Sequence, residues 1–437
     1  MLNRLQMVVS LGIFTSIAFL VGQQPSSSLP GIGPKPSLPP PNPAAETANF
    51  STAGKWPAGS MPTPLAGFTV QRFADGLVNP RWLYVLPNGD VLVAESSTKP
   101  KPPKDEKEKR VQTLLRQAGN IAQSADRITL LRDADRDGVV DSRTVFKEGL
   151  NQPFGMLLIK DRFYVANTDG ILQFAYKPGQ TSVEGPGKKI LSLPAGGYNN
   201  HWTRNLVTNS AGTKFYASIG SASNVAEHGM EVEVRRATIL EINPDGSGER
   251  VYASGLRNPN GMDWQPGTNI LWTVVNERDN LGDDLVPDYL TNVRDGGFYG
   301  WPYSYFGQNV DPRVKERRPD LVNKAIVPDF ALGPHTASLG MTFYKGEAFP
   351  ERYRGGVFVG QHGSWNRTQF SGYKVIFVPF RDGRPVAPVE DFLTGFLADA
   401  KTGRTNGRPV GVAVDGAGAL LVADDTGNTV WRVRPAK

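Results

Sequence analysis

The sequence predicts an all-β fold, a six-bladed β-propeller preceded by a signal segment and a Pro-rich linker. Gly and Pro are abundant, at 48 and 35 of 437 residues, which is typical of a turn-rich chain. Six segments of one pattern recur across residues 68–437, each with Gly, usually Pro, a short strand, a turn signal and a second strand. No helical periodicity runs through that span, so short strands at regular spacing favour a propeller over an irregular array of β-sandwiches.

The N-terminal region carries the features of an export signal. Residues 1–22 hold Arg4 and then the apolar run Met7–Val21, which is shorter than the roughly 20 residues of a spanning helix. Phe19-Leu20-Val21-Gly22 is a poor cleavage site, so an uncleaved anchor with loose membrane association is the alternative. We expect an exported protein, either periplasmic or secreted.

The rest of the chain divides into a linker and one domain. Residues 23–66 are rich in Pro, Ser and Ala, which predicts a stiff, extended tether. Residues 67–437 form the predicted propeller, and the charged segment 97–125 interrupts it with a short helix expected around Val111–Ile121.

Composition excludes several kinds of chemistry. The chain has no Cys, which excludes disulfides, thiolate metal sites, iron–sulfur clusters and a Cys nucleophile, and it has only four His. The net charge is +6, but residues 99–116 alone hold seven Lys or Arg against three Asp or Glu. A solvated insertion explains this basicity better than a nucleic-acid surface, so we expect no nucleic-acid partner.

Polar residues keep the phase of the repeat. The first strand of each propeller blade lines the central channel, so the loops that lead into these strands meet on one face. His201, His335, Arg257 and Arg408 fall at or near this position, and His362 ends one of the repeats. Scattered surface residues would not keep this register, so a polar site on the axis is expected.

Two of these positions suggest specific chemistry. His201 follows Asn199-Asn200 and could act as a general base or serve as a structural histidine that satisfies turn backbone. Arg257-Asn258 suits an anionic, oxygen-rich ligand, whereas an inter-blade salt bridge is the structural alternative.

Two acidic segments are candidate calcium sites. Residues 276–284 form an oxygen-dense loop suited to Ca²⁺, or else a solvated acidic turn. Asp133–Gly138 resembles the start of a calcium loop, but Thr144 stands at its twelfth position in place of Glu, so a hairpin turn is favoured there.

Several motifs in order resemble one family. The segments NHWTRNLV, GLRNPNGM, NERDNLGDDL with GGFYGWP, HGSWNR with GYKV, and GRPVGVAVDG lie between residues 140 and 435. They resemble the soluble quinoprotein glucose dehydrogenases and, more closely, the sorbosone dehydrogenase-like sugar dehydrogenases that depend on pyrroloquinoline quinone (PQQ).

The resemblance implies a mechanism and a set of residues. His201 would take the hydroxyl proton of the sugar while hydride passes to PQQ, and Arg257 would stabilise the developing charge. Backbone carbonyls near Asp279 and Asn280 would hold Ca²⁺. The glucose enzymes have Gly-Pro at these two positions, so a side-chain ligand is a further option in this chain. Three residues compete as the counterpart of the family's cofactor lysine: His362, Arg367 and Lys374. The implied cofactor-binding residues are Gln152, Arg204, Arg257, Asn258, His362, Arg367, Lys374 and Arg408.

The resemblance also implies partners: a sugar or sorbosone-like aldehyde as substrate, and a quinone or cytochrome as external electron acceptor. Two other hypotheses remain at this point. One is a calcium-dependent, lactonase-like hydrolase, and the other is a non-catalytic propeller that binds glycan or protein.

Overall fold

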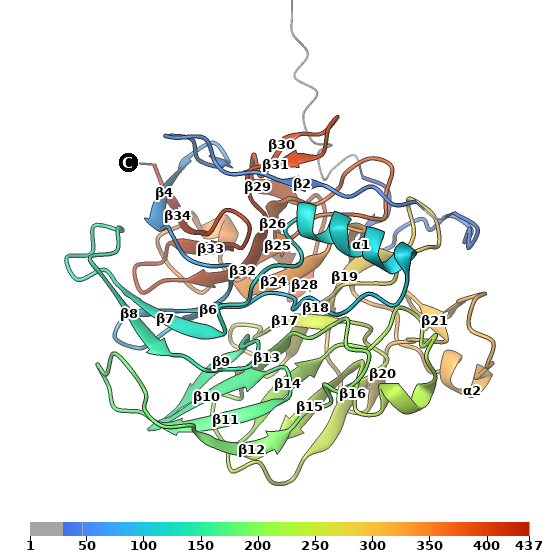
Figure 1. Ribbon diagram of the computed structural model, residues 1–437, viewed down its shortest axis with the longest axis horizontal. Helices are drawn as coiled ribbons and strands as arrows, with labels where there is room; N and C mark the ends of the chain where they lie inside the picture. Colours follow the sequence, from blue (N-terminus) through green and yellow to red (C-terminus); the bar gives the residue numbers. More distant parts are fainter. Residues whose placement is uncertain (1–28, 46, 437) are drawn as a thin grey trace, which may run out of the picture.

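The computed structural model describes residues 29–45 and 47–436, so the signal-like segment 1–22 lies outside the described residues. Six sheets of four or five strands dominate this part of the chain (Figure 1). The all-β prediction is confirmed, and the arrangement is consistent with a propeller.

Each copy of the sequence repeat supplies the first two strands of one sheet, and the sheets follow one another along the chain. The first three sheets are β5 (Pro80–Val85), β6 (Val91–Glu95), β7 (Arg127–Arg132) and β8 (Ser142–Lys147); β9 (Met156–Ile159), β10 (Arg162–Asn167), β11 (Gly170–Ala175) and β12 (Lys188–Ser192); and β13 (Arg204–Thr208), β14 (Phe215–Ile219), β15 (Thr238–Ile242) and β16 (Arg250–Ser254), with β20 (Gly297–Phe298) at the edge.

The other three sheets include strands from the N-terminal part of the chain. They are β17 (Pro259–Trp264), β18 (Leu271–Val275), β19 (Pro287–Asn292), β23 (Phe330–Pro334) and β1 (Ile32–Gly33); β24 (Ser338–Phe343), β25 (Val357–Gln361), β26 (Lys374–Val378), β29 (Glu390–Thr394) and β3 (Thr63–Pro64); and β32 (Pro409–Val414), β33 (Leu420–Asp424), β34 (Thr429–Pro435) and β4 (Phe68–Ala74). In the last of these, β4 pairs with β34, so the two ends of the domain complete one sheet.

The first strands of the six sheets contact one another in a ring: β5, β9, β13, β17, β24, β32 and again β5. Glycines at one phase of the repeat allow this approach. A Cβ on Gly155, Gly261 or Gly340 would lie 2.6, 2.5 or 2.0 Å from backbone atoms of the next first strand. The repeated glycine therefore sets how closely neighbouring sheets meet at the axis.

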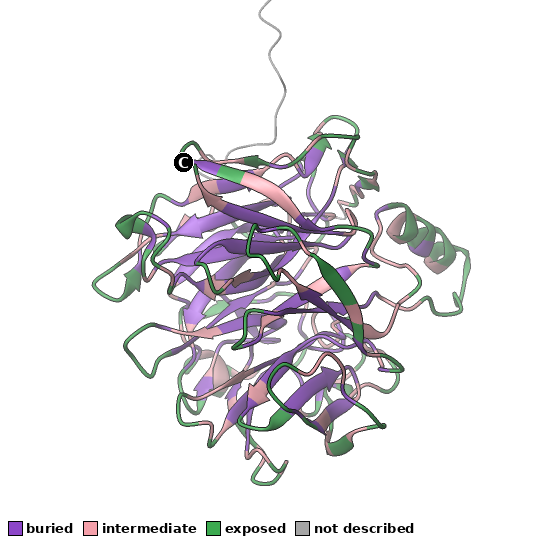
Figure 2. Ribbon diagram, turned by 90° about the vertical axis from the view of Figure 1, so that its left-hand side faces the viewer, coloured by how far each residue is buried: buried purple, intermediate pink, exposed green. Residues whose placement is uncertain are grey.

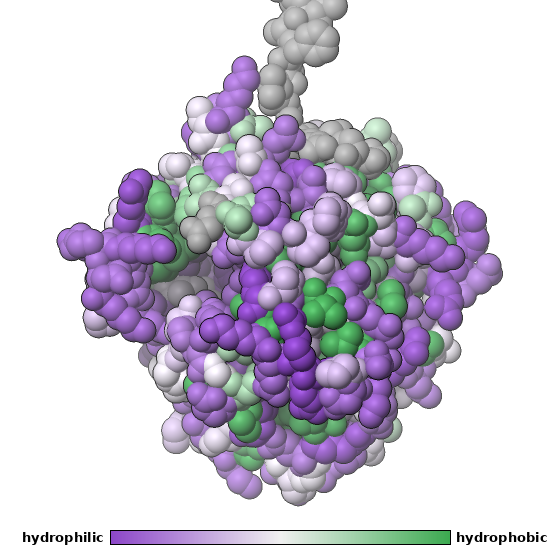
Figure 3. Space-filling view, turned by 90° about the vertical axis from the view of Figure 1, so that its right-hand side faces the viewer, coloured by the Kyte–Doolittle hydropathy of each residue, from purple (hydrophilic) through white to green (hydrophobic). Residues whose placement is uncertain are grey.

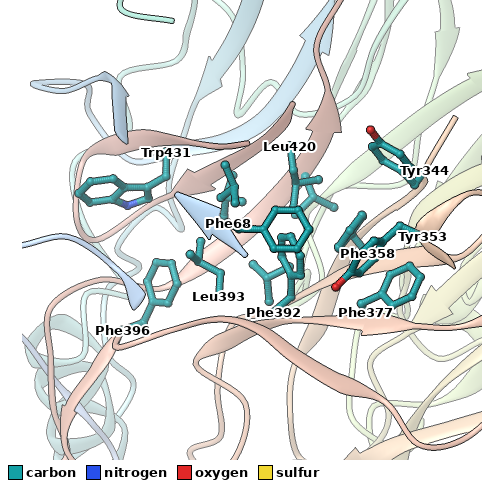
Figure 4. Close-up of a cluster of buried hydrophobic side chains, with 14 of the residues drawn as sticks. Phe68, Tyr344, Tyr353, Phe358, Phe377, Phe392, Leu393, Phe396, Leu420 and Trp431 are labelled. Carbon is teal, nitrogen blue, oxygen red and sulfur yellow. The ribbon is translucent and has the colours of Figure 1, made fainter. Parts of the chain in front are cut away.

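Apolar strand residues fill the spaces between sheets. Figure 4 shows one such cluster, in which Phe68, Phe358 and Phe392 pack edge-to-face with other aromatic rings. Figure 2 shows the same pattern across the molecule, with buried strands inside and exposed loops outside. Hydrophilic residues cover most of the face seen in Figure 3.

The Pro-rich segment does not behave as a free tether over its described part. Its short strands β1 and β3 extend two of the large sheets, and β2 (Thr52–Ala53) pairs with β31 (Arg404–Thr405), next to β30 (Leu397–Asp399). Proline-rich chain already favours extended backbone, so such segments dock as edge strands at low cost in entropy.

The insertion forms the longer of the two α-helices in the described residues. The helix α1 (Glu106–Gln117) begins earlier than expected because Asp105 accepts a hydrogen bond from Glu108 N at 2.7 Å, and the chain turns at Gly119 with φ +74°. The remaining elements are the hairpins β21 (Ser304–Tyr305) with β22 (Asn309–Val310) and β27 (Phe380–Arg381) with β28 (Arg384–Pro385), the short α2 (Pro319–Val322), and 3₁₀ turns at Met230–Glu233 and Glu351–Tyr353. Within the described residues, the helices are all too short or too polar to cross a membrane.

Candidate active site

His201 lies directly before β13, in a loop that leads into the ring of first strands. Its Nδ1 is 2.8 Å from the carbonyl oxygen of Ser221, which can only accept, so Nδ1 carries the proton. Nε2 then presents a lone pair, and in the described part of the chain it has no hydrogen-bond partner. Burial and the nearby charge of Arg257 lower the His201 pKa to about 3, so the ring is neutral at ordinary pH. A neutral, partly exposed imidazole with a free nitrogen can accept a proton.

Two contacts fix the position of this ring. A Cβ on Gly220 would lie 2.5 Å from His201 Cβ and 2.4 Å from Asn258 Oδ1, so this glycine lets both residues approach. Arg204 lies behind the loop and donates to the His201 carbonyl at 2.6 Å and to Thr203 O at 2.8 Å. Arg204 is fully buried, and these hydrogen bonds go to backbone carbonyls, so its guanidinium stabilises the loop that carries His201.

Arg257 lies beside His201 with its donors directed at the neighbouring loops. It bonds Glu277 O at 2.6 Å and Asn224 Oδ1 at 2.9 Å, and it pairs with Asp279 at 3.1 Å. Asn258 Oδ1, by contrast, is buried without a hydrogen-bond partner among the described residues. The pair thus combines a fixed cation with an unused acceptor.

Asp279 lies between Arg257 and His335. Burial opposes its ionisation, but His335, at 3.5 Å from its carboxylate, and Arg257 hold its pKa below the usual range. The His335 pKa is raised: burial alone would lower it, and Asp279 and the carbonyl of Gly282 outweigh that effect. The implied site set omits His335, although the repeat phase does single it out.

The carbonyls implied as calcium ligands are already occupied. Arg313 Nη1 lies 2.6 Å from Asp279 O and 3.0 Å from Asn280 O. Asn280 Oδ1 accepts from Asn366 at 2.9 Å, and the Asp279 carboxylate serves Arg257 and His335. Because a guanidinium and an imidazole use these oxygens, the residues do not fit a calcium ion at this loop.

A second charged group contacts Trp202. Arg81 sits 5.5 Å from the Trp202 ring and pairs with Asp425 at 2.6 Å, and His362 Nε2 lies 2.8 Å from the same carboxylate. Burial, followed by the charge of Arg408, lowers the His362 pKa to about 4. Arg81 Nε is buried without a partner in the described residues, so one guanidinium donor remains unused here.

Arg408 joins this group to the insertion. Its guanidinium bonds His362 O at 2.8 Å, Gly363 O at 3.1 Å, and Ala118 O and Asn120 Oδ1 just beyond α1. The insertion therefore packs against the polar axis. The sequence analysis had treated it as a solvated, charged segment.

Three other cofactor candidates have different partners. Gln152 Nε2 donates to Ser97 O at 2.9 Å, and Arg367 bonds Asp284 at 2.9 Å and Gln369 O. Lys374, at the start of β26, bonds Asp391 at 3.0 Å, so its ammonium is used within its own sheet. Of the competing counterparts to the family lysine, His362 joins the group of Arg81 and Arg408.

The Asp133 turn is a hydrogen-bonded hairpin loop, as favoured from sequence. Gly138 N donates to Asp133 and Val139 N to Asp137. The carboxylates of Asp133, Asp135 and Asp141 lie within 4.8 Å of one another, and the last two residues are exposed.

The N-terminal segment covers part of the site's rim. Thr47 bonds Asp283 at 3.0 Å, Asn49 N bonds Trp365 O at 2.7 Å, and the Phe50 ring stacks on Trp365 at 5.3 Å. Sequence reasoning missed these contacts because they join residues more than 200 positions apart.

Comparison with known proteins identifies the family of this chain. A family model described as "Domain of unknown function (DUF7133)" matches residues 65–364, well over half of the chain. The chain belongs to the DUF7133 family. A second model, described as TrAA12-like, matches residues 309–436.

Curated relatives of this DUF7133 protein include sugar dehydrogenases. An uncharacterized protein of Borreliella burgdorferi is 32% identical over 55% of this chain and 62% of its own. The aldose sugar dehydrogenase YliI of Escherichia coli is 31% identical over 27% of this chain and 30% of its own. The chain thus spans less than two thirds of the length of these relatives.

Solved structures show the same fold. The PQQ domain of a pyranose dehydrogenase from Coprinopsis cinerea superposes with a TM-score of 0.68 at 21% identity, covering 88% of this chain and 100% of that one. The soluble aldose sugar dehydrogenase of Escherichia coli gives 0.58 at 16% identity, covering 84% and 100%. These relatives confirm the resemblance to PQQ-dependent sugar dehydrogenases that the sequence motifs carry.

Proposed function

We propose that this chain is a PQQ-dependent oxidoreductase that oxidises a sugar or a sugar-derived aldehyde of the aldose or sorbosone type. The observation that carries the proposal is His201, a neutral imidazole whose Nδ1 proton is held by Ser221 O and whose Nε2 is free. The names of the relatives support the same activity.

The surrounding residues fit an acidic, planar cofactor. The three arginines Arg81, Arg257 and Arg408 outnumber the carboxylates Asp279 and Asp425 in the two charged groups. Arg81 Nε and Asn258 Oδ1 offer one unused donor and one unused acceptor. A ligand with several carboxylates and polar ring atoms would satisfy both the excess charge and these free atoms.

In this proposal each residue has a defined task. When bound, PQQ supplies the two-electron redox chemistry that amino-acid side chains lack. His201 accepts the proton of the sugar hydroxyl at Nε2. Arg257, held by Asn224 and Asp279, provides a fixed positive charge beside it. An anionic ligand would offset the effect of Arg257 and raise the His201 pKa toward the working range.

Several finer expectations belong to the same proposal. Each of the six large sheets would be one blade of a propeller, the protein would be exported, and a quinone or cytochrome would accept the electrons. The lactonase-like alternative needs free carboxylates for a central metal. Among the described residues, Asp279 pairs with Arg257 and Asp425 pairs with Arg81, so this alternative has little structural support.

The test combines a binding and an activity readout. The purified full chain is titrated with PQQ and assayed for dye reduction with a panel of sugars and sugar aldehydes. We expect His201→Ala to lower kcat by about 100-fold or more while PQQ affinity changes little. The matched control is His228→Ala, because His228 is an exposed histidine whose ring lies tilted against Tyr198.

Two results would count against the proposal. A wild-type chain that neither binds PQQ nor reduces dye refutes the dehydrogenase assignment. Activity within tenfold of wild type in His201→Ala refutes the role of His201 alone.

A further inference from the structure

We propose that Arg313 is the resident cation of the loop at Asp279 and Asn280, and that its guanidinium keeps divalent metal out of that loop. One nitrogen, Nη1, lies 2.6 Å from Asp279 O and 3.0 Å from Asn280 O. Consecutive carbonyls of extended chain point in opposite directions. Here Asn280 has φ 65°, and this left-handed turn brings both oxygens to the same donor.

Arg313 is held in place by a buried carboxylate. Asp311 receives Arg313 Nε at 3.0 Å and Nη2 at 2.8 Å, which is a two-point contact. The Asp311 side chain is 0% exposed, and it also pairs with buried Arg278 at 3.2 Å. Because Asp311 holds both Nε and Nη2, the guanidinium presents Nη1 to the two carbonyls in one orientation.

The geometry leaves no room for a metal beside Arg313. Calcium takes about six to eight oxygen ligands at roughly 2.3–2.6 Å, so an ion on both carbonyls would lie against Nη1. Two positive charges at contact repel strongly where water is scarce. The carboxylate of Asp279 and the side-chain oxygen of Asn280 already serve Arg257, His335 and Asn366, so they are not free to complete a metal shell.

The consequence is that guanidinium groups, in place of a metal ion, supply the positive charge at this loop. Arg313 and Arg257 both lie on Asp279, one at its carbonyl and the other at its carboxylate. The extension to the cofactor rests on the proposed function, whereas the exclusion of metal does not.

The first experiment measures metal binding by the full chain. Asp135→Asn and Asp141→Asn are introduced together, since these exposed carboxylates lie near Asp133 and could bind Ca²⁺ separately. After treatment with a chelator, the protein is titrated with CaCl₂ by calorimetry and with Tb³⁺ by luminescence. We expect no saturable binding up to about 1 mM, the weak end of protein calcium sites. Adding Arg313→Met should produce a saturable site.

Either of two results would overturn the exclusion of metal. One is stoichiometric Ca²⁺ binding with Arg313 intact. The other is a failure of Arg313→Met to gain any binding, since Arg313 would then not be what keeps metal out. Circular dichroism and thermal unfolding establish that each variant is folded, and Arg313→Lys, which keeps the charge, provides a second variant.

The second experiment measures PQQ binding in EGTA, with and without added Ca²⁺. We expect equal affinity in both conditions, a loss of tenfold or more in Arg313→Met, and no change in Arg317→Met. Arg317 is a matched control because it lies in the same segment and bonds the carbonyl of Asp311 at 3.0 Å. A wild-type chain that binds PQQ only with Ca²⁺ overturns the inference. One that never binds PQQ refutes the proposed function, and the metal titration still decides the role of Arg313.

Discussion

The ring of first strands depends on glycines, and Gly340→Ala tests this directly. A Cβ at this position of β24 would lie 2.0 Å from Val410 O and 3.0 Å from Gly411 Cα, whereas ordinary contact begins at 3.4 Å. Both atoms are backbone of the neighbouring strand β32, so no side chain can rotate away. The two strands must separate by about 1.4 Å to reach ordinary contact, which loosens packing that both sheets share.

We expect Gly340→Ala to lower the free energy of unfolding by about 3 kcal/mol, the upper part of the range for overpacking. Urea unfolding followed by tryptophan fluorescence and circular dichroism measures the change. Gly416→Ala is the matched control, because its Cβ would meet no atom within 4 Å and its φ is not in the left-handed region. That variant should be neutral or slightly more stable. A Gly340→Ala protein within about 0.5 kcal/mol of wild type would refute the packing role of the glycine.

Three further predictions follow from buried charges and from the N-terminal segment. The His362 pKa is lowered to about 4, below the ordinary value of 6.5. As the pH falls from 6.5 toward 4, His362 therefore becomes protonated in the unfolded chain while it stays neutral in the folded chain. Wild type should therefore lose about 2 kcal/mol more than His362→Gln between pH 7 and pH 5, and equal losses in urea unfolding would contradict this. Asp311→Asn leaves buried Arg278 and Arg313 without their shared carboxylate, and should cost about 3 kcal/mol; thermal unfolding checks it, and a shift below 1 °C would count against it. Phe50→Ala removes the stacking on Trp365 at 5.3 Å, so limited proteolysis should cleave near residue 50 faster, while an unchanged cleavage rate would argue that the segment is held elsewhere.

The candidate site was predictable where residues follow the repeat. His201, Arg257 and Arg408 are found from their phase relative to the strands, because strand period and turn residues are local properties of the chain. His335 shares that phase, and it could have been included in the predicted site on the same ground.

Other expectations changed because only the folded chain determines which partners a polar side chain binds. Arg204 was expected to bind the cofactor, yet its guanidinium donates hydrogen bonds to backbone carbonyls of the His201 loop. Lys374 bonds Asp391 and Arg367 bonds Asp284, and no local sequence pattern predicts either pair. Arg313 was not among the predicted site residues, and only the folded chain brings it to Asp279, 34 positions away.

The sequence by itself determined the class of fold, because alternating apolar residues, glycines and prolines act within a few positions of one another. It also determined which loops carry histidine and arginine toward the axis. Only the tertiary structure decided what those residues bind: Arg313 reaches two carbonyls across 33 and 34 positions, and the Pro-rich segment docks as edge strands. The physical reason is that an oxygen is equally well satisfied by a metal or by a guanidinium, and only the folded chain brings one of them within reach.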